Sequence, residues 1–223
     1  MNHFATTKQI IAYYDDFLKY LKIDHTREGT RHKKIKSDLT AIVKKDMDIL
    51  DLGCGTGITS KYMADLGAKV TAMDISPKLI EYAKENSYHK NINYVIGDIA
   101  GTITPNSSKT FDLICLIDIM EHLPKDKIPH VLTNIIKHSH KDTIIYLNIP
   151  DARFQEWIQM NHPEKQQIID QSYSMISILT WFNSINFEVA NIVIYGIETP
   201  IQYVSYYFIK KESVHSNYRN SLE

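Results

Sequence analysis

The stretch Ile49-Leu-Asp-Leu-Gly-Cys-Gly-Thr-Gly57 decides the predicted fold. It begins as a short apolar strand and continues through Gly53, Gly55 and Gly57 into a helix. Glycine suits this turn because a ligand must approach the backbone closely and the turn needs φ angles that other residues resist. A dinucleotide fingerprint reads G-x-G-x-x-G, whereas this turn reads D-x-G-x-G-x-G. Asp51 would repel a pyrophosphate but suits a ligand with an amino group and a sulfonium.

Strands and helices alternate around this turn. The predicted strands end at Asp51, Asp74, Asp98, Asp118 and Pro150. The helices between them are predicted over residues 59–66, 77–86 and 124–138. Near-continuous apolar strands that alternate with helices indicate a parallel sheet covered on both faces. Such sheets bind ligands beyond the carboxyl ends of their strands, where the four acids are expected to gather.

Further elements flank this core. Two helices are predicted before it, over 9–21 and from Arg31 onward, with a polar linker at 22–30. A polar insertion at 151–171 follows the core, then a helix around residues 175–182. The chain continues as two strands, 187–195 and 201–209, joined as a hairpin, and ends in a polar tail.

Composition narrows the function classes. With 25 basic and 26 acidic residues, the net charge of −1 offers no global attraction to nucleic acid or to an anionic membrane. Cys54 and Cys115 show no disulfide or metal-binding spacing, so reduced thiols in a cytoplasmic protein are expected. The amino terminus lacks the order of a signal peptide, and no apolar run approaches the length of a membrane span.

Two further acids follow the glycine turn at informative distances. Asp74 lies 17 residues past Gly57, at the end of the second strand, where an acid can accept hydrogen bonds from both hydroxyls of a ribose. Ser76-Pro77 then begins the next helix with a good N-cap and a proline in its first position. Asp98 closes the third strand, where it could accept a hydrogen bond from an adenine amino group. The three acids together predict an adenosine site.

The order of these motifs resembles the class I S-adenosylmethionine-dependent methyltransferases. The resemblance is carried by ILDLGCGTG (49–57), VTAMDISPKLIEYAKE (70–85), VIGDI (95–99) and FDLICLIDIMEHLPK (111–125), and it covers about residues 31–150. Within this class the chain is most similar to small-molecule enzymes of the ubiquinone-pathway O-methyltransferase type.

The resemblance implies a fold and a domain organisation. The expected fold is an α/β Rossmann-like three-layer sandwich with N-terminal helices. Its sheet would have seven mostly parallel strands, the last one antiparallel. We expect a single domain over residues 1–223, divided into a helical cap at 1–30, a core at 31–210 that holds the 151–171 insertion, and a flexible tail at 211–223.

The resemblance also implies which residues bind S-adenosylmethionine, the expected cofactor. Those expected to line its methionine part are Asp51, Gly53 and Gly55. Asp74 and Ile75 would hold the ribose, and Asp98 and Ile99 the adenine. Ile117 would contact the cofactor through its backbone, and Arg31 would grip the methionine carboxylate.

The segment Asp118-Ile-Met-Glu121-His122 follows the fourth strand and has three interpretations. His122 could take a proton from the acceptor, since an imidazole titrates near neutral pH. The residues Asp118, Glu121 and His122 could instead bind a divalent ion. Finally, Glu121 and His122 could simply brace the following helix. We take His122 as the predicted catalytic residue and predict no metal.

The acceptor is expected to meet the amino-terminal helix and the 151–171 insertion, because loops at strand ends carry specificity in this architecture. On that helix Tyr14 falls on the apolar face, whereas Tyr13 lies off it and is the better candidate for touching a substrate. The basic run 31–36 is expected to be a solvated helix face, apart from Arg31.

The predicted function is transfer of a methyl group from S-adenosylmethionine to an oxygen or nitrogen atom of a small molecule. We expect no nucleic-acid or membrane partner, and either a monomer or a homodimer. The alternatives are methylation of RNA or protein and a non-catalytic cofactor-binding module. The N/D-P-P-Y motif of amino-methylating nucleic-acid enzymes does not follow the fourth strand, where the sequence reads Asp118-Ile-Met-Glu121.

Overall fold

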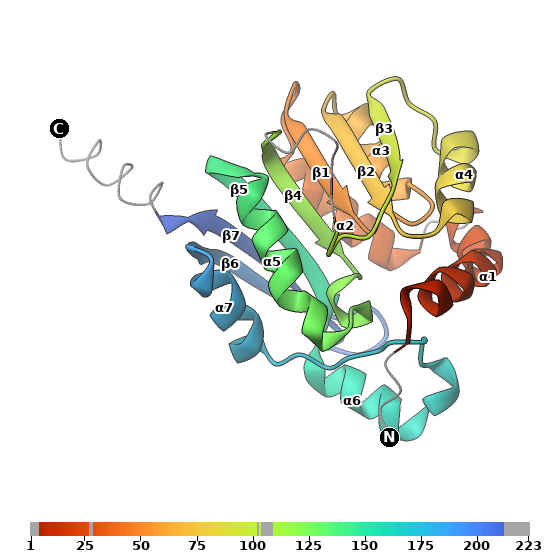
Figure 1. Cartoon of the computed structure of the whole chain (residues 1–223). Coiled ribbons are helices and arrows are strands. Elements are labelled where there is room, and N and C mark those ends of the chain that lie inside the picture. Colours follow the sequence, from red (N-terminus) through yellow and green to blue (C-terminus); the bar gives the residue numbers. More distant parts are fainter. Residues whose placement is uncertain (1–4, 27–28, 102, 104–108, 212–223) are drawn as a thin grey trace. The chain divides into compact units, whose positions relative to one another are not determined.

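The computed structural model describes residues 5–26, 29–101, 103 and 109–211 (Figure 1). The predicted tail at 211–223 lies outside these residues except for Lys211. The chain separates into two compact units, Met1–Pro105 and Asn106–Glu223.

The first unit is an α/β layer built on three parallel strands. Its elements are α1 (Thr7–Thr26), α2 (Thr30–Ile42), β1 (Asp48–Leu52), α3 (Ile58–Asp65), β2 (Lys69–Asp74), α4 (Pro77–Asn86) and β3 (Ile92–Ile96). The strands lie in the order β3-β2-β1, with Leu52 beside Met73 and Asp74 beside Ile96. Ile49, Leu52 and Met73 are fully buried, so these strands form the core of the unit.

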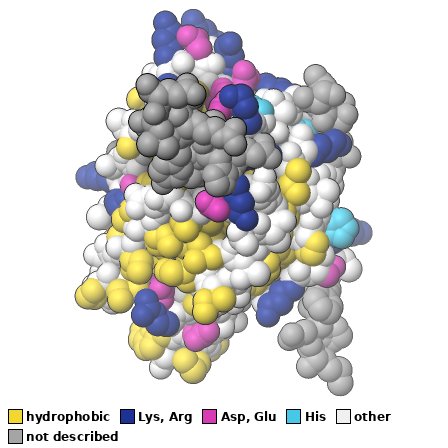
Figure 2. Space-filling view, turned by 90° about the vertical axis from the view of Figure 1, so that its left-hand side faces the viewer, with side chains coloured by type: hydrophobic (Ala, Val, Ile, Leu, Met, Phe, Trp, Pro, Cys, Tyr) yellow, Lys and Arg dark blue, Asp and Glu magenta, His cyan; other side chains and the backbone are white. Residues whose placement is uncertain are grey.

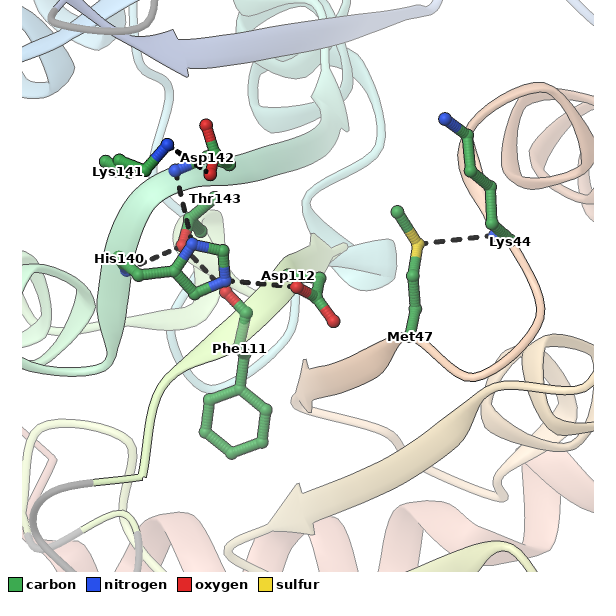
Figure 3. Close-up of polar contacts among 8 residues, drawn as sticks. All are labelled: Lys44, Met47, Phe111, Asp112, His140, Lys141, Asp142 and Thr143. Carbon is green, nitrogen blue, oxygen red and sulfur yellow. Dashed lines mark hydrogen bonds and ion pairs between the residues drawn. The ribbon is translucent and has the colours of Figure 1, made fainter.

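Local signals set the element boundaries in the first unit. Helix α4 begins where predicted, because the Ser76 hydroxyl accepts the Leu79 N–H at 3.1 Å and Pro77 occupies the first turn. A short turn leads into β1, in which the Lys44 N–H lies 3.2 Å from the Met47 sulfur (Figure 3).

The predicted linker at 22–30 is wrong in its first half, because α1 continues to Thr26. Polar residues extend the helix here, and the Lys22 ammonium lies over the Tyr82 ring of α4, 5.2 Å from its centroid. A polar composition therefore did not mark the end of the helix. Residues 27–28 lie outside the described part of the chain.

The second unit holds a four-stranded mixed sheet. Its strands and α-helices are β4 (Phe111–Ile117), α5 (Ile128–Lys137), β5 (Ser139–Pro150), α6 (Ala152–Asn161), α7 (Met175–Ser184), β6 (Phe187–Tyr195) and β7 (Tyr203–Lys210). Short 3-10 turns lie at Met120–His122, Lys125–Lys127 and Pro163–Lys165. The strand order is β4-β5-β7-β6, and β7 runs antiparallel to both of its neighbours.

Three strands in the first unit and four in the second confirm the predicted α/β class with seven mostly parallel strands and an antiparallel last strand. Strand β6 has the predicted bounds. The 151–171 insertion, in which no helix is predicted, contains α6, and the Asp151 carboxylate accepts the Arg153 N–H at 3.0 Å as the N-cap of this helix.

A cluster of polar contacts connects the start of β5 to β4 (Figure 3). The Thr143 hydroxyl donates to the Phe111 carbonyl at 2.7 Å and accepts the His140 N–H at 2.8 Å. The His140 Nε2 lies 3.1 Å from the Asp112 carboxylate. These contacts stand where the β4–β5 register shifts, between Phe111 and Leu113, so side chains replace part of the regular strand pairing.

Helix α7 presents one buried and one exposed face. Phe182 is fully buried and stacks on Phe208 of β7, with ring centroids 4.2 Å apart. Ile176 on the same helix is 77% exposed, and Val189 and Ile194 on β6 are also exposed. Figure 2 views this side of the molecule, where hydrophobic side chains gather on the surface. No helix of the described residues has the length and apolarity to cross a membrane.

The α7–β7 contact should contribute strongly to the stability of the second unit. We expect Phe182→Ala to lower the free energy of unfolding by about 3–5 kcal/mol, because it opens a cavity in a close-packed core. Ile176→Ala on the exposed face should change it by about 0.5 kcal/mol or less. Urea denaturation of both variants checks this, and equal effects would contradict the assignment of the buried face.

Candidate functional site

The glycine turn is held tightly against the end of β2. The Gly53 and Cys54 N–H groups both donate to the Met73 carbonyl, at 2.8 and 2.9 Å. Gly53, Gly55 and Gly57 have φ angles of 77°, 54° and 78°, in the left-handed region that favours glycine. The conformational demand predicted from the sequence is therefore present at all three positions.

The last two glycines of the turn serve different purposes. A Cβ at Gly57 would lie 2.4 Å from the Tyr94 hydroxyl, so close packing excludes a side chain there. A Cβ at Gly55 would meet nothing within 4 Å. The backbone at Gly55 therefore borders open space, as a ligand that lies against this turn requires.

Asp74 links the glycine turn to the start of α4. One carboxylate oxygen accepts the Gly55 N–H at 2.9 Å and the other accepts the Ser76 N–H at 2.9 Å. Burial raises the pKa of Asp74, and these backbone hydrogen bonds oppose the rise. An ionised carboxylate has about four acceptor positions. Beside its backbone donors, Asp74 therefore keeps acceptor capacity for a ribose hydroxyl.

Asp51 is the second buried acid of this region, with 1% of its surface exposed. It accepts hydrogen bonds from the Ser60 hydroxyl at 2.5 Å and the Thr59 hydroxyl at 3.3 Å, both on α3. Burial raises its pKa to about 6, and the charge of Asp74 adds to the rise. Two acids with raised pKa values beside a glycine turn are typical of a binding site, and here they favour a cationic ligand.

The structure also brings Asp98 to this edge of the sheet. The Gly97 N–H donates to the Asp74 carbonyl at 2.9 Å, and the Asp98 carboxylate accepts the Ala100 N–H at 2.9 Å. Ile99 is buried, whereas Asp98 and Ile75 are half-buried.

The remaining candidates of the first unit lie on its first two helices. Arg31 is half-buried in the first turn of α2. On α1, Tyr13 stacks on Phe17 at 5.6 Å and meets Tyr14 edge-on at 5.3 Å. Both tyrosines are half-buried, so burial does not separate them as the helical pattern predicted.

In the second unit, the residues after β4 form a tight turn. Ile117 pairs with Asn148 of β5, and the Asp118 N–H donates to the Asn148 carbonyl at 3.0 Å. Asp118 has a φ of 50°, which is uncommon outside glycine and often occurs at functional sites. Glu121 and His122 follow in the 3-10 turn, and Glu121 is only 2% exposed.

The His122 ring lies between two carboxylates. Its Nδ1 is 2.9 Å from the Ile169 carbonyl and 3.7 Å from the Asp170 carboxylate, and its Nε2 is 3.8 Å from the Glu121 carboxylate. Because a carbonyl can only accept, Nδ1 carries the hydrogen at the 2.9 Å contact with Ile169, and in the neutral ring the lone pair is on Nε2. The arrangement braces the ring and leaves one nitrogen able to take a proton.

The proposed metal set Asp118, Glu121 and His122 does not converge in the structure. Over the described ranges, no group of three His, Cys, Asp or Glu side chains is placed to hold an ion. The prediction that no metal is bound remains a prediction.

Sequence reasoning missed Asp170 and Tyr173. Asp170 reaches His122 from the insertion, 48 positions away, and burial raises the pKa of its carboxyl. Tyr173 is 7% exposed, and its hydroxyl finds no hydrogen-bond partner among the described residues. Burial, with Glu121 nearby, raises the pKa of Tyr173 to about 12. Neither residue belongs to a periodic pattern, so the sequence carried no signal for them.

Comparison with known proteins gives the family. The profile of a methyltransferase domain family matches residues 24–192, which is most of the chain. The chain therefore belongs to this methyltransferase domain family. The match confirms the class I S-adenosylmethionine-dependent methyltransferase resemblance seen in the motifs.

Individual relatives cover shorter stretches. The chain is 41% identical over 85 residues to the mitochondrial ubiquinone biosynthesis O-methyltransferase of Schizosaccharomyces pombe, a match over 35% of this chain and 30% of that protein. It is 36% identical over 102 residues to the ubiquinone biosynthesis O-methyltransferase of Coxiella burnetii, over 45% of this chain and 42% of that protein. The chain thus spans less than half the length of these relatives.

A solved structure shows the same fold. Magnesium protoporphyrin IX methyltransferase from Synechocystis, solved with bound S-adenosylhomocysteine, has a TM-score of 0.66 and 14% sequence identity. The alignment covers 91% of this chain and all of that one. At this identity the likeness concerns the fold alone, and it confirms the predicted Rossmann-like class.

Burial of Asp51 should make the stability of the fold depend on pH. Its folded pKa of about 6 lies above the ordinary value of 3.8, so the ionised carboxylate destabilises the fold as pH rises through this range. Asp51→Asn keeps one oxygen for Ser60. It should be more stable than the unsubstituted protein at pH 7.5 by about 1–3 kcal/mol, and equal to it near pH 3.5.

Urea denaturation at both pH values checks this prediction, with the exposed Asp65→Asn as the control. If Asp51→Asn were less stable at pH 7.5, the charge of Asp51 would hold the turn together rather than strain it.

Proposed function

We propose that the chain is an S-adenosylmethionine-dependent methyltransferase that methylates an oxygen atom of a small molecule. The observation that carries this proposal is the pair of buried acids, Asp51 and Asp74, at a glycine turn that leaves open space at Gly55. The membership of the family and the O-methyltransferase names of the relatives support it.

The residues of the first unit fit the cofactor. Asp74 has acceptor capacity for the ribose hydroxyls, and Gly55 allows close approach of the backbone. The Asp51 charge suits the positively charged methionine part. We assign the adenine to Asp98 and Ile99.

The remaining assignments rest on position in the motifs. Gly53 would lie beside the methionine part, Ile75 beside the ribose and Arg31 beside the methionine carboxylate. Ile117, at the end of β4 in the second unit, would contact the cofactor through its backbone.

S-adenosylmethionine supplies a methyl group activated by its sulfonium. In-line transfer of that methyl group to an acceptor oxygen would break the carbon–sulfur bond and release the proton of the acceptor. We assign that proton to Nε2 of His122. The carboxylates of Asp170 and Glu121 then stabilise the imidazolium. Beyond this, the chain contributes by positioning the reactants and excluding water.

We further propose a single-domain protein that works in the cytoplasm, as a monomer or homodimer, without a nucleic-acid partner. Cys54 and Cys115 are buried and form no disulfide, and the net charge is −1. One relative is mitochondrial, and fluorescence microscopy of a tagged chain tests whether this chain is in the cytoplasm.

The proposed function is tested with the purified chain and a panel of phenols, carboxylates and sugars. Calorimetry measures the binding of S-adenosylmethionine, and chromatography measures the S-adenosylhomocysteine formed with each acceptor. Binding with turnover supports the proposal. Binding without turnover on any small molecule, RNA or protein would indicate a non-catalytic module.

Asp74→Ala should weaken the binding of S-adenosylmethionine, because the ribose hydroxyls lose an ionised acceptor. The expected loss is about 1.5–3 kcal/mol for each charge-assisted hydrogen bond removed. Calorimetry on Asp74→Ala and the milder Asp74→Asn checks this, with the exposed Asp65→Ala as the control. Unchanged affinity in both Asp74 variants would mean that the adenosine site has been misplaced.

His122→Ala should lower kcat by about 100- to 10,000-fold and leave cofactor affinity nearly intact. The variant should also lose a limb of the pH–rate profile near neutral pH. A chelator should have no effect on the unsubstituted enzyme. Normal turnover with a lower melting temperature would instead make His122 a structural brace, and silencing by the chelator with rescue by Mg²⁺ or Zn²⁺ would make it a metal ligand.

A further inference from the structure

The Asp15 side chain of helix α1 forms hydrogen bonds with the start of α4. The Ser76 hydroxyl donates to the Asp15 carboxylate at 2.6 Å, and the Lys78 N–H points to the same carboxylate oxygen at 3.3 Å. Asp15 and Ser76 are 61 positions apart in the sequence. Further along, the Lys22 ammonium covers the Tyr82 ring. The two helices therefore run side by side in the same direction within the first unit.

Ser76 stands between Asp15 and the predicted ribose-binding acid. It is fully buried, its N–H donates to the Asp74 carboxylate at 2.9 Å, and its hydroxyl oxygen accepts the Leu79 N–H at 3.1 Å. A serine hydroxyl has one hydrogen to donate. Because Asp15 accepts that hydrogen, the hydroxyl oxygen is oriented with its lone pairs toward the Leu79 N–H.

We infer that Asp15 is a positioning residue for cofactor binding. It acts through Ser76 on Asp74, so that docking of α1 and binding of S-adenosylmethionine strengthen each other. The inference rests on the proposed role of Asp74. It adds that a residue of the first helix with no predicted role tunes the affinity of a site built on β1, β2 and β3.

The physical reason is that Asp15 and Ser76 preorganise the Asp74 carboxylate for binding. The Asp74 carboxylate must keep its remaining acceptor capacity aimed at the ribose, and the Gly55 and Ser76 N–H groups help to set its orientation. Ser76 is in turn fixed by its bond to Asp15. The Asp15 charge also lies at the amino end of α4, where the helix dipole favours an anion. Loss of Asp15 loosens Ser76 and broadens the range of Asp74 orientations.

Docking of α1 and binding of S-adenosylmethionine are thermodynamically linked. If α1 stabilises the binding-competent Asp74, then the bound cofactor must stabilise docked α1 by the same factor. Trypsin reports on this directly, because Lys19 and Lys22 lie on α1 and the Lys19 side chain is 56% exposed.

The experiment measures the dissociation constants of S-adenosylmethionine and S-adenosylhomocysteine by calorimetry on the full chain. Asp15→Ala should weaken both by about 5- to 30-fold, a part of the roughly 10- to 150-fold that loss of a charge-assisted hydrogen bond to the ligand itself would cause. Asp15→Asn keeps an oxygen for the Ser76 hydroxyl and should recover most of the affinity. The control is Asp16→Ala on the same helix, because Asp16 is exposed and pairs with Lys19; its affinity should stay unchanged.

A double-mutant cycle tests whether Asp15 acts on cofactor binding through Ser76. Ser76→Ala breaks the same link, so Asp15→Ala combined with Ser76→Ala should weaken binding no more than Ser76→Ala alone. In the unsubstituted protein the cofactor should slow tryptic cleavage at Lys19 and Lys22. In Asp15→Ala this protection should be lost, although the apo protein still unfolds cooperatively.

The outcomes separate this inference from the proposed function. If Asp74→Ala weakens binding and Asp15→Ala does not, Asp15 only braces the helix and the inference is wrong. If Asp15→Ala lowers the melting temperature but not the affinity, the same conclusion follows. If neither Asp74 variant affects binding, the adenosine site is misplaced and the inference falls with it. If Asp15→Ala does not fold, the affinities of Asp15→Asn and Ser76→Ala test the inference instead. Asp15→Asn should keep most of the affinity, and Ser76→Ala should lose it.

Discussion

The Asp74 carboxylate accepts one backbone N–H from the glycine turn and one from the start of α4. The glycine turn after β1 and the start of α4 after β2 are thereby both bound to the buried Asp74 carboxylate. The Met73 carbonyl, one residue earlier, accepts two more N–H groups from the same turn. Because β1 and β2 pair in parallel, these bonds lie at the carboxyl edge of the sheet. The left-handed glycines and the N-cap of α4 are arranged around this anion.

Burying two acids near each other costs stability, and the raised pKa values of Asp51 and Asp74 report that cost. The fold tolerates the acids because serine and threonine hydroxyls of α3 bind Asp51 and backbone N–H groups bind Asp74. Proteins keep such strain where a ligand relieves it. A cationic cofactor would do so here.

Much of this site could be predicted from the sequence, because its determinants are local. The positive φ angles follow from the glycines, the start of α4 follows from Ser76-Pro77, and the acids follow the ends of apolar runs. Contacts between distant segments could not be predicted in this way. Asp15 lies on the polar face of a helix, and Asp170 lies in a stretch without periodicity. Only the folded chain brings them to Ser76 and His122. Helix α6 was missed because its apolar residues do not form one buried face: Trp157 and Met160 are exposed, and its buried residue is Gln155.

The contact between His122 and the 169–170 segment has an evolutionary consequence. The segment expected to choose the acceptor also supplies the carbonyl and the carboxylate that surround the histidine ring. Under the proposed role of His122, a lineage that remodels this segment for a new acceptor also changes the proton affinity of the base. Substrate range and optimum pH would then drift together among descendants of this chain.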